Sequence, residues 1–264
     1  MIDWGLYLVL GAFAGLLAGL LGVGGGLIIV PVLAALFLLQ GVPGDIIMHL
    51  ALGTSLASIV FTSLSSIYAH QRHGAICWPP FRQLTPGIIL GAAVGGWLAG
   101  QMSTSWLKPL FALFELGVGL HLLLSVETHA HRNLPSPARM TGAGGVIGMV
   151  SSLVGIGGGT LTVPFLVWHS VSIRQAIATS AACGLPIALA GSLSFIINGL
   201  QQPLLPEHTL GYVHLPALLG VAISSVLFAP LGARLTHRLP VTMLKKILGG
   251  LLLLLAAKLL LSEM

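Results

Sequence analysis

The chain has 264 residues, of which 56% are hydrophobic and only 6% are charged, and its mean hydropathy is +1.01. Soluble proteins carry roughly 25% charged residues, so this composition excludes an ordinary soluble domain and predicts a polytopic helical membrane protein. The formal net charge of +5 is interpreted as a topological signal, and no nucleic-acid partner is expected. Cys77 and Cys183 have no metal or redox spacing, so both are expected to be free thiols.

Five apolar runs in the first half of the chain are matched by five in the second half. They cover residues 5–21, 27–39, 46–69, 84–102 and 109–126, and then 141–154, 159–170, 176–199, 212–234 and 243–261. A polar stretch that contains histidines separates the two sets. The sequence therefore predicts an all-α fold with a first transmembrane repeat at 1–126, a cytoplasmic linker at 127–140 and a second repeat at 141–264.

Each half begins with a glycine string. The stretch AGLLGVGGGLIIVPVL covers residues 18–33, SSLVGIGGGTLTVPFL covers 151–166, and the two agree at every glycine from Gly22 on. Glycine inside a helix is less favourable than alanine by about 1 kcal/mol, so three in a row predict unwound backbone. A second helix is expected to begin just before Pro31 or Pro164, because proline is tolerated best in a first helical turn. The amide N–H groups at that helix N-terminus would form an anion site.

The first two runs of each half are short for a membrane span of roughly 20 residues. They would form either one broken crossing or a helical hairpin, re-entrant or short, with its glycine tip inside the membrane. The hairpin places most of the lysines and arginines on one side, so the positive-inside rule favours it. This topology predicts both termini outside a bacterial inner membrane and an inverted second repeat, which is an architecture of secondary transporters.

The third run of each half carries a matching Thr-Ser pair, in ALGTS (51–55) and AIATS (176–180). An α-helix rises about 1.5 Å per residue, so the number of residues before them places these hydroxyls and the glycine strings near the middle of the membrane. Because no lysine or arginine is expected at that depth, an anion would be held there by amides and hydroxyls. The candidate substrate-binding residues are Gly24, Gly25, Gly26, Thr54, Ser55, Gly157, Gly158, Gly159, Thr160, Thr179 and Ser180.

These motifs resemble those of a known family. The string GVGGGLIIVP, the GTS helix and the second string GIGGGTLTVP are similar, over essentially the full chain, to the sulfite exporter TauE/SafE family of membrane permeases. The resemblance implies transport of a sulfur-containing anion such as sulfite, thiosulfate or an organosulfonate. Ala178 stands where the first repeat has Gly53, so the two half-sites need not contribute equally. No cofactor or metal is expected, and a homodimer is left open.

Several alternatives remain open at this point. Close helix packing is an alternative role for the glycine strings, although three consecutive glycines exceed what packing requires, and a single hydroxyl often bonds back to its own helix. Glu115 is an intramembrane carboxylate and a candidate for proton coupling, although pairing with His121 or an inter-subunit cavity would also accommodate it. No enzyme is expected, because the sequence contains no HExxH or GxSxG motif. The alternative function is an anion channel, or a transporter of another small carboxylate or oxyanion.

Overall fold

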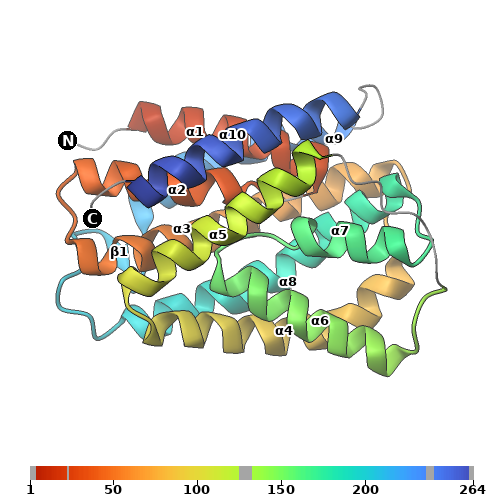
Figure 1. Ribbon diagram of the computed structural model, residues 1–264, viewed down its shortest axis with the longest axis horizontal. Coiled ribbons are helices and arrows are strands. Elements are labelled where there is room, and N and C mark those ends of the chain that lie inside the picture. The colour runs from red at the N-terminus through yellow and green to blue at the C-terminus, as the bar shows by residue number, and fades with distance from the viewer. Residues whose placement is uncertain (1–3, 23, 125–132, 236–240, 262–264) are drawn as a thin grey trace.

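The computed structural model describes residues 4–22, 24–124, 133–235 and 241–261. This part of the chain forms ten α-helices and one two-stranded sheet (Figure 1). The helices of the first half are α1 (Trp4–Leu21), α2 (Gly26–Leu39), α3 (Gly44–Arg72), α4 (Trp78–Gln101) and α5 (Thr104–Leu123). Those of the second half are α6 (Pro137–Leu153), α7 (Gly159–Trp168), α8 (Ile173–Gly199), α9 (Leu215–Leu235) and α10 (Val241–Leu261).

The described helices have the lengths and the outward faces of membrane spans. Five of them, α1, α3, α5, α8 and α9, are long and apolar enough to cross a membrane, and α2 and α7 are shorter apolar helices. Large apolar side chains such as Val9 and Leu90 are each 70% exposed, as is expected of side chains that face lipid. The prediction of a helical polytopic membrane protein is confirmed apart from one short two-stranded sheet, and the inverted repeats and glycine-tipped hairpins stay predictions. Residues 127–132 of the expected linker lie outside the described residues.

Two helix starts differ from the sequence expectation. The helices after the glycine strings begin at Gly26 and Gly159, five residues before Pro31 and Pro164, so the expected start just before each proline is wrong. Gly25 adopts a left-handed φ of 78° and turns the chain directly into the first turn of α2. The fixed φ of proline is compatible with a helix, although its missing N–H and the contact of its ring with the carbonyl four residues earlier carry a cost. Pro31 and Pro164 nonetheless lie within α2 and α7.

The segment before α9 is extended rather than helical. The ninth apolar run was expected from residue 212, but Thr209–Leu210 (β1) and Val213–His214 (β2) pair as antiparallel strands and α9 begins at Leu215. Gly211 connects the strands with a φ of 53°, a conformation that favours glycine. The Tyr212 ring is buried and stacks on His49 with centroids 4.8 Å apart. This short hairpin thus reaches in against α3.

The two halves of the chain are interleaved. Helix α1 packs mainly against α9, α4 against α6 and α8, α3 against α8 and α9, and α5 against α10. Glycines four residues apart permit the closest of these contacts. Gly11, Gly15 and Gly19 of α1 face the backbone of α9, and Gly87, Gly91 and Gly95 of α4 face that of α6. The core therefore lies between the halves.

Candidate functional site

The two glycine strings meet inside this bundle. A Cβ atom added to Gly24 would lie 2.9 Å from the Cα of Gly157, and one added to Gly26 would lie 2.6 Å from the carbonyl oxygen of Gly155. Helix α2 lies in the left half of Figure 1 and α7 in the right half, so the helices that follow the strings extend from this contact toward opposite ends. The side-chain-free backbone of each string is thus what allows the other to approach.

The backbones of the two strings are alike at their first glycine and differ afterwards. Gly22 and its equivalent Gly155 have φ values of 69° and 67°. Gly24 and Gly25 are also left-handed, at 77° and 78°, whereas Gly158, the equivalent of Gly25, has a φ of −66°. Both strings lead into a helix N-terminus, where the first N–H groups have no acceptor within the helix and the helix dipole favours an anion.

The predicted serines of the third helices bind these strings across the repeats. The hydroxyl of Ser55 donates to the carbonyl oxygen of Gly155 at 2.8 Å. The equivalent Ser180 lies 3.4 Å from the carbonyl oxygen of Gly22 and also donates to Ile177 in its own helix, at 2.8 Å. Each serine therefore contacts the first glycine of the opposite string.

The predicted threonines bind a different part of the chain. The hydroxyl oxygen of Thr54 accepts a hydrogen bond from the backbone N–H of His214 at 2.9 Å. That of Thr179 accepts one from the N–H of Cys77, also at 2.9 Å. Both donors stand three residues after a left-handed glycine, Gly211 or Gly74, and just before a long helix. The threonines therefore fasten the extended segments that precede α9 and α4.

The difference between Gly53 and Ala178 has a structural cause. A Cβ atom at Gly53 would collide with the carbonyl oxygen of Tyr212, so the β1–β2 hairpin can lie against α3 only because residue 53 is glycine. Ala178 instead packs with Ile76 and Ala182 in a small apolar cluster. The segments before α9 and α4 are therefore bound by equivalent threonines, but the residue before each threonine packs differently.

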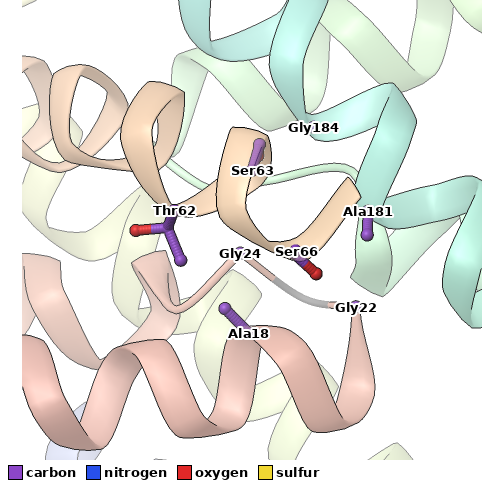
Figure 2. A pocket seen from close by; sticks show the side chains of 8 residues that line it. All are labelled: Ala18, Gly22, Gly24, Thr62, Ser63, Ser66, Ala181 and Gly184. Carbon is purple, nitrogen blue, oxygen red and sulfur yellow. The ribbon is translucent and has the colours of Figure 1, made fainter. Parts of the chain in front are cut away.

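A small cavity lies beside the first string (Figure 2). Its lining comes from α1, the link between α1 and α2, α3 and α8, and consists of Ala18, Gly22, Gly24, Thr62, Ser63, Ser66, Ala181 and Gly184. The volume of about 10 Å³ is close to the least that can hold one water molecule. No charged side chain lines it, so the donors it offers are hydroxyls and backbone amides.

The cavity contains one of the predicted site residues, Gly24, and three hydroxyl residues that the sequence interpretation missed. Thr62 lies 2.7 Å from the Ser225 hydroxyl and donates to Ser58, whereas the Ser66 hydroxyl is buried without a partner in the described structure. A signal for them existed: Ser55, Ser58, Thr62 and Ser66 are spaced by three or four residues and so share one helical face.

The remaining candidates lie elsewhere. Thr160 is in the first turn of α7, and its hydroxyl is buried without a partner in the described structure. Glu115 is fully buried in α5, neither of its carboxylate oxygens has a hydrogen-bond partner among the described residues, and it does not line the cavity. The alternative pairing with His121 is therefore not formed, and His121 is exposed. Within the described residues, no group of three or more His, Cys, Asp or Glu side chains is placed to hold a metal ion.

Known proteins resemble this chain over nearly its full length. The model of the family described as "Sulfite exporter TauE/SafE" matches residues 7–259. A probable membrane transporter protein of Haemophilus influenzae is 41% identical over 242 residues, which cover 91% of this chain and 92% of the relative. One of Methanocaldococcus jannaschii is 26% identical over 255 residues, 94% of this chain and 91% of the relative. No solved structure shows a significant match.

The helical bundle and these matches together define a membrane transporter. The chain belongs to the sulfite exporter TauE/SafE family. The resemblance carried by the two glycine strings and the GTS helix is thereby confirmed, and the structure brings both strings to one place.

Proposed function

We propose that the protein is a secondary transporter that moves a small sulfur-containing anion, such as sulfite, thiosulfate or an organosulfonate, across a bacterial inner membrane. The observation that carries this proposal is the contact between the two glycine strings deep in the bundle, with a helix N-terminus leading away from each. Amide N–H groups and helix dipoles together attract a small anion. Because they carry no formal positive charge, they also release it.

The proposed mechanism is alternating access between two inverted repeats. Its support is the equivalence of contacts made by the two halves. The Ser55 contact to Gly155 has its counterpart in Ser180 and Gly22, and the Thr54 contact to His214 has its counterpart in Thr179 and Cys77. The α1–α9 contact is likewise matched by α6–α4. A bundle built of such equal halves can rock one set of helices against the other around a central site.

Glu115 is the proposed proton-coupling residue. It is a fully buried carboxylate in a helix long and apolar enough to cross the membrane, and both oxygens are without hydrogen-bond partners in the described structure. Intramembrane carboxylates of this kind mark proton pathways in transporters. The equivalent residue in the second repeat, Leu252, is apolar. The coupling site is therefore proposed for one repeat only.

Flux through the purified protein in liposomes tests the proposal. We expect uptake of radiolabelled sulfite or thiosulfate to saturate at a modest turnover, whereas a channel would conduct without saturation. Gly158→Leu should abolish uptake. Among the glycines of the strings, Gly158 is chosen because its φ is ordinary for any residue. Its added side chain would first meet the ends of the Ile187 and Thr162 side chains, which can move, rather than backbone atoms.

The control for this variant is Gly117→Leu. Gly117 is exposed on α5, and a Cβ atom there meets nothing within 4 Å. Both variants should reach the membrane in wild-type amounts, but only Gly117→Leu should transport. Wild-type uptake by Gly158→Leu would show that transport does not depend on the second glycine string, and absence of uptake of all sulfur anions by the wild type would overturn the proposed function.

A further inference from the structure

The C-terminal half of α3 differs in polarity from the equivalent part of α8. One buried face of α3 carries Ser58, Thr62, Ser66 and His70, whereas the equivalent residues of α8 are Cys183, Ile187, Gly191 and Phe195. The four α3 residues are at most 2% exposed, so this polarity is not a solvent-facing feature of the bundle. Polar side chains buried in a membrane bundle characteristically face its interior or a cavity that carries substrate.

The residues that line the cavity beside the first string differ in size from their equivalents beside the second string. Ala181 and Gly184 line it from α8, and their equivalents in α3 are the larger Leu56 and Ile59. The δ1 methyl of Leu56 lies 3.0 Å from where a Cβ of Gly191 would stand, and Gly191 is the equivalent of Ser66. The branched side chain of Leu56 therefore lies where the equivalent of the cavity residue Ser66 stands in the second repeat.

Ser66 gives the cavity a free hydrogen-bond donor. Its side chain is 2% exposed, its hydroxyl has no hydrogen-bond partner in the described structure, and it lines the cavity. Figure 2 shows the Ser66 side chain together with Gly22 and Gly24, the two glycines of the first string that line the cavity. A buried hydroxyl without a partner is costly, and among the hydroxyls that are buried without a partner in the described structure, Ser66 alone lines the cavity.

We propose that the sulfur oxyanion binds on one side only, between α3 and the first glycine string, with the Ser66 hydroxyl as a direct donor. This inference rests on the proposed function and adds the position of the site to it. The sulfonate or sulfite oxygens accept from the Ser66 hydroxyl and from the backbone N–H of Gly24, which also lines the cavity. The second string completes the packing of the first but does not form a second anion site.

The size of the cavity implies movement of α8. A volume of about 10 Å³ is near the space for one water molecule and is too small for an anion with three oxygen atoms around sulfur. The lining residues of α8 are the small Ala181 and Gly184, so α8 can separate from α3 without withdrawing long side chains from between them. The structure therefore corresponds to a contracted state of the site.

Two serine-to-alanine variants test this asymmetry. Ser151, in α6, is the equivalent of the cavity residue Ala18, and its hydroxyl is also fully buried without a partner in the described structure. Affinities of the wild type, Ser66→Ala and Ser151→Ala are measured for sulfite, thiosulfate and sulfoacetate by calorimetry. Loss of one hydrogen bond to a charged acceptor should weaken binding by Ser66→Ala roughly tenfold to hundredfold. Ser151→Ala should bind as the wild type does.

Thermal unfolding separates a binding role from a structural one. Neither alanine variant removes a formed hydrogen bond, so both should unfold at or above the wild-type temperature. A second measurement uses Ser66→Cys and Ser151→Cys in a background without Cys77 and Cys183. N-ethylmaleimide should label Ser66→Cys during turnover, and the anion that binds the wild type best should slow it, whereas Ser151→Cys should stay unlabelled.

The outcomes distinguish the inference from the function on which it rests. If the wild type binds none of the anions, the proposed function fails. If the wild type binds and Ser66→Ala is unchanged, or if both serine variants weaken binding equally, the one-sided site is wrong while the function stands. If Ser66→Ala fails to fold, the labelling of Ser66→Cys becomes the test. Labelling that the anion does not slow would overturn the inference.

Discussion

At the scale of single residues, Thr54 and Thr179 were predicted to donate to the anion, but in this structure both accept hydrogen bonds from the backbone. Their donors, the N–H groups of His214 and Cys77, belong to the segments that precede α9 and α4. The hydroxyl proton and the second lone pair of each threonine oxygen are left for another partner. The residues predicted as binding groups therefore also fix the positions of two long helices.

This arrangement predicts a stability defect in Thr54→Val. Valine keeps the shape of threonine but leaves the buried N–H of His214 without an acceptor, which costs about 1–3 kcal/mol. Thermal unfolding of the purified protein measures the loss, and Thr54→Ser should restore most of it. Unchanged stability together with a large loss of anion affinity would show that the hydroxyl belongs to the binding site instead.

A second prediction at this scale concerns Glu115→Gln. Glutamine has nearly the same shape as glutamate but cannot carry a proton across the membrane. If Glu115 couples protons, the variant should exchange anions across the membrane but lose uptake driven by a pH gradient. Both fluxes are measured in liposomes, with Glu207→Gln, in the connection between α8 and β1, as the control. Gradient-driven uptake at the wild-type rate would exclude this role for Glu115.

At the scale of elements, the glycine strings combine two properties that the sequence interpretation treated as alternatives. They pack closely, because Gly26 lies against the backbone of Gly155 and Ile156. They also leave the N-termini of α2 and α7 beside the point of contact. Close packing through glycine is thus the means by which the two helix ends are brought together.

We therefore predict that Gly26→Ala is destabilising although alanine is the better helix former. Its Cβ would lie 2.6 Å from the carbonyl oxygen of Gly155 and 2.8 Å from the Cα of Ile156. Backbone atoms cannot rotate away, so overpacking should cost about 1–3 kcal/mol. Gly117→Ala, which meets nothing within 4 Å, should be neutral or stabilising. Equal unfolding temperatures for the two variants would contradict the observed contact between the strings.

At the scale of the whole molecule, the interleaving of the two halves determines what can move. Helices α1 and α9 form one close pair, α4 and α6 form another, and α3 and α8 lie between the pairs. A transporter of this construction would move such pairs as units, because their glycine-mediated contacts leave little space between the helices. The α3–α8 contact, which includes the cavity, is the place where separation would open the site.

The proposed topology makes a prediction at this scale. Both termini should lie outside and the linker in the cytoplasm, so a cysteine at Ser136 should be labelled only after the membrane is permeabilised. A cysteine at Thr209, in β1, should be labelled in intact cells. Both are introduced into a background without Cys77 and Cys183, which are free thiols. Labelling of Ser136→Cys from outside would invalidate the inverted arrangement.

The sequence by itself determined the class of protein, nearly all the helix positions and the family. Apolar runs of helix length are local signals, and they predict helices because a membrane leaves the backbone no other satisfied structure. The runs at 27–39 and 243–261, for example, agree with α2 and α10 to within two residues. The two glycine strings were equally visible, since their repetition needs no knowledge of the fold.

The tertiary structure alone decided which residues the strings and hydroxyls contact. The binding of Thr54 to His214 joins residues 160 positions apart, and no local pattern specifies such a pair. The left-handed conformation of Gly25 and the ordinary φ of Gly158 differ although the two strings match in sequence. The cavity at Ser66 arises because small residues of α8 face it, whereas the larger Leu56 lies beside Gly191, the equivalent of Ser66. Two similar sequences give two similar backbone traces. The sizes of the side chains that meet between α3 and α8 then decide beside which glycine string a cavity forms.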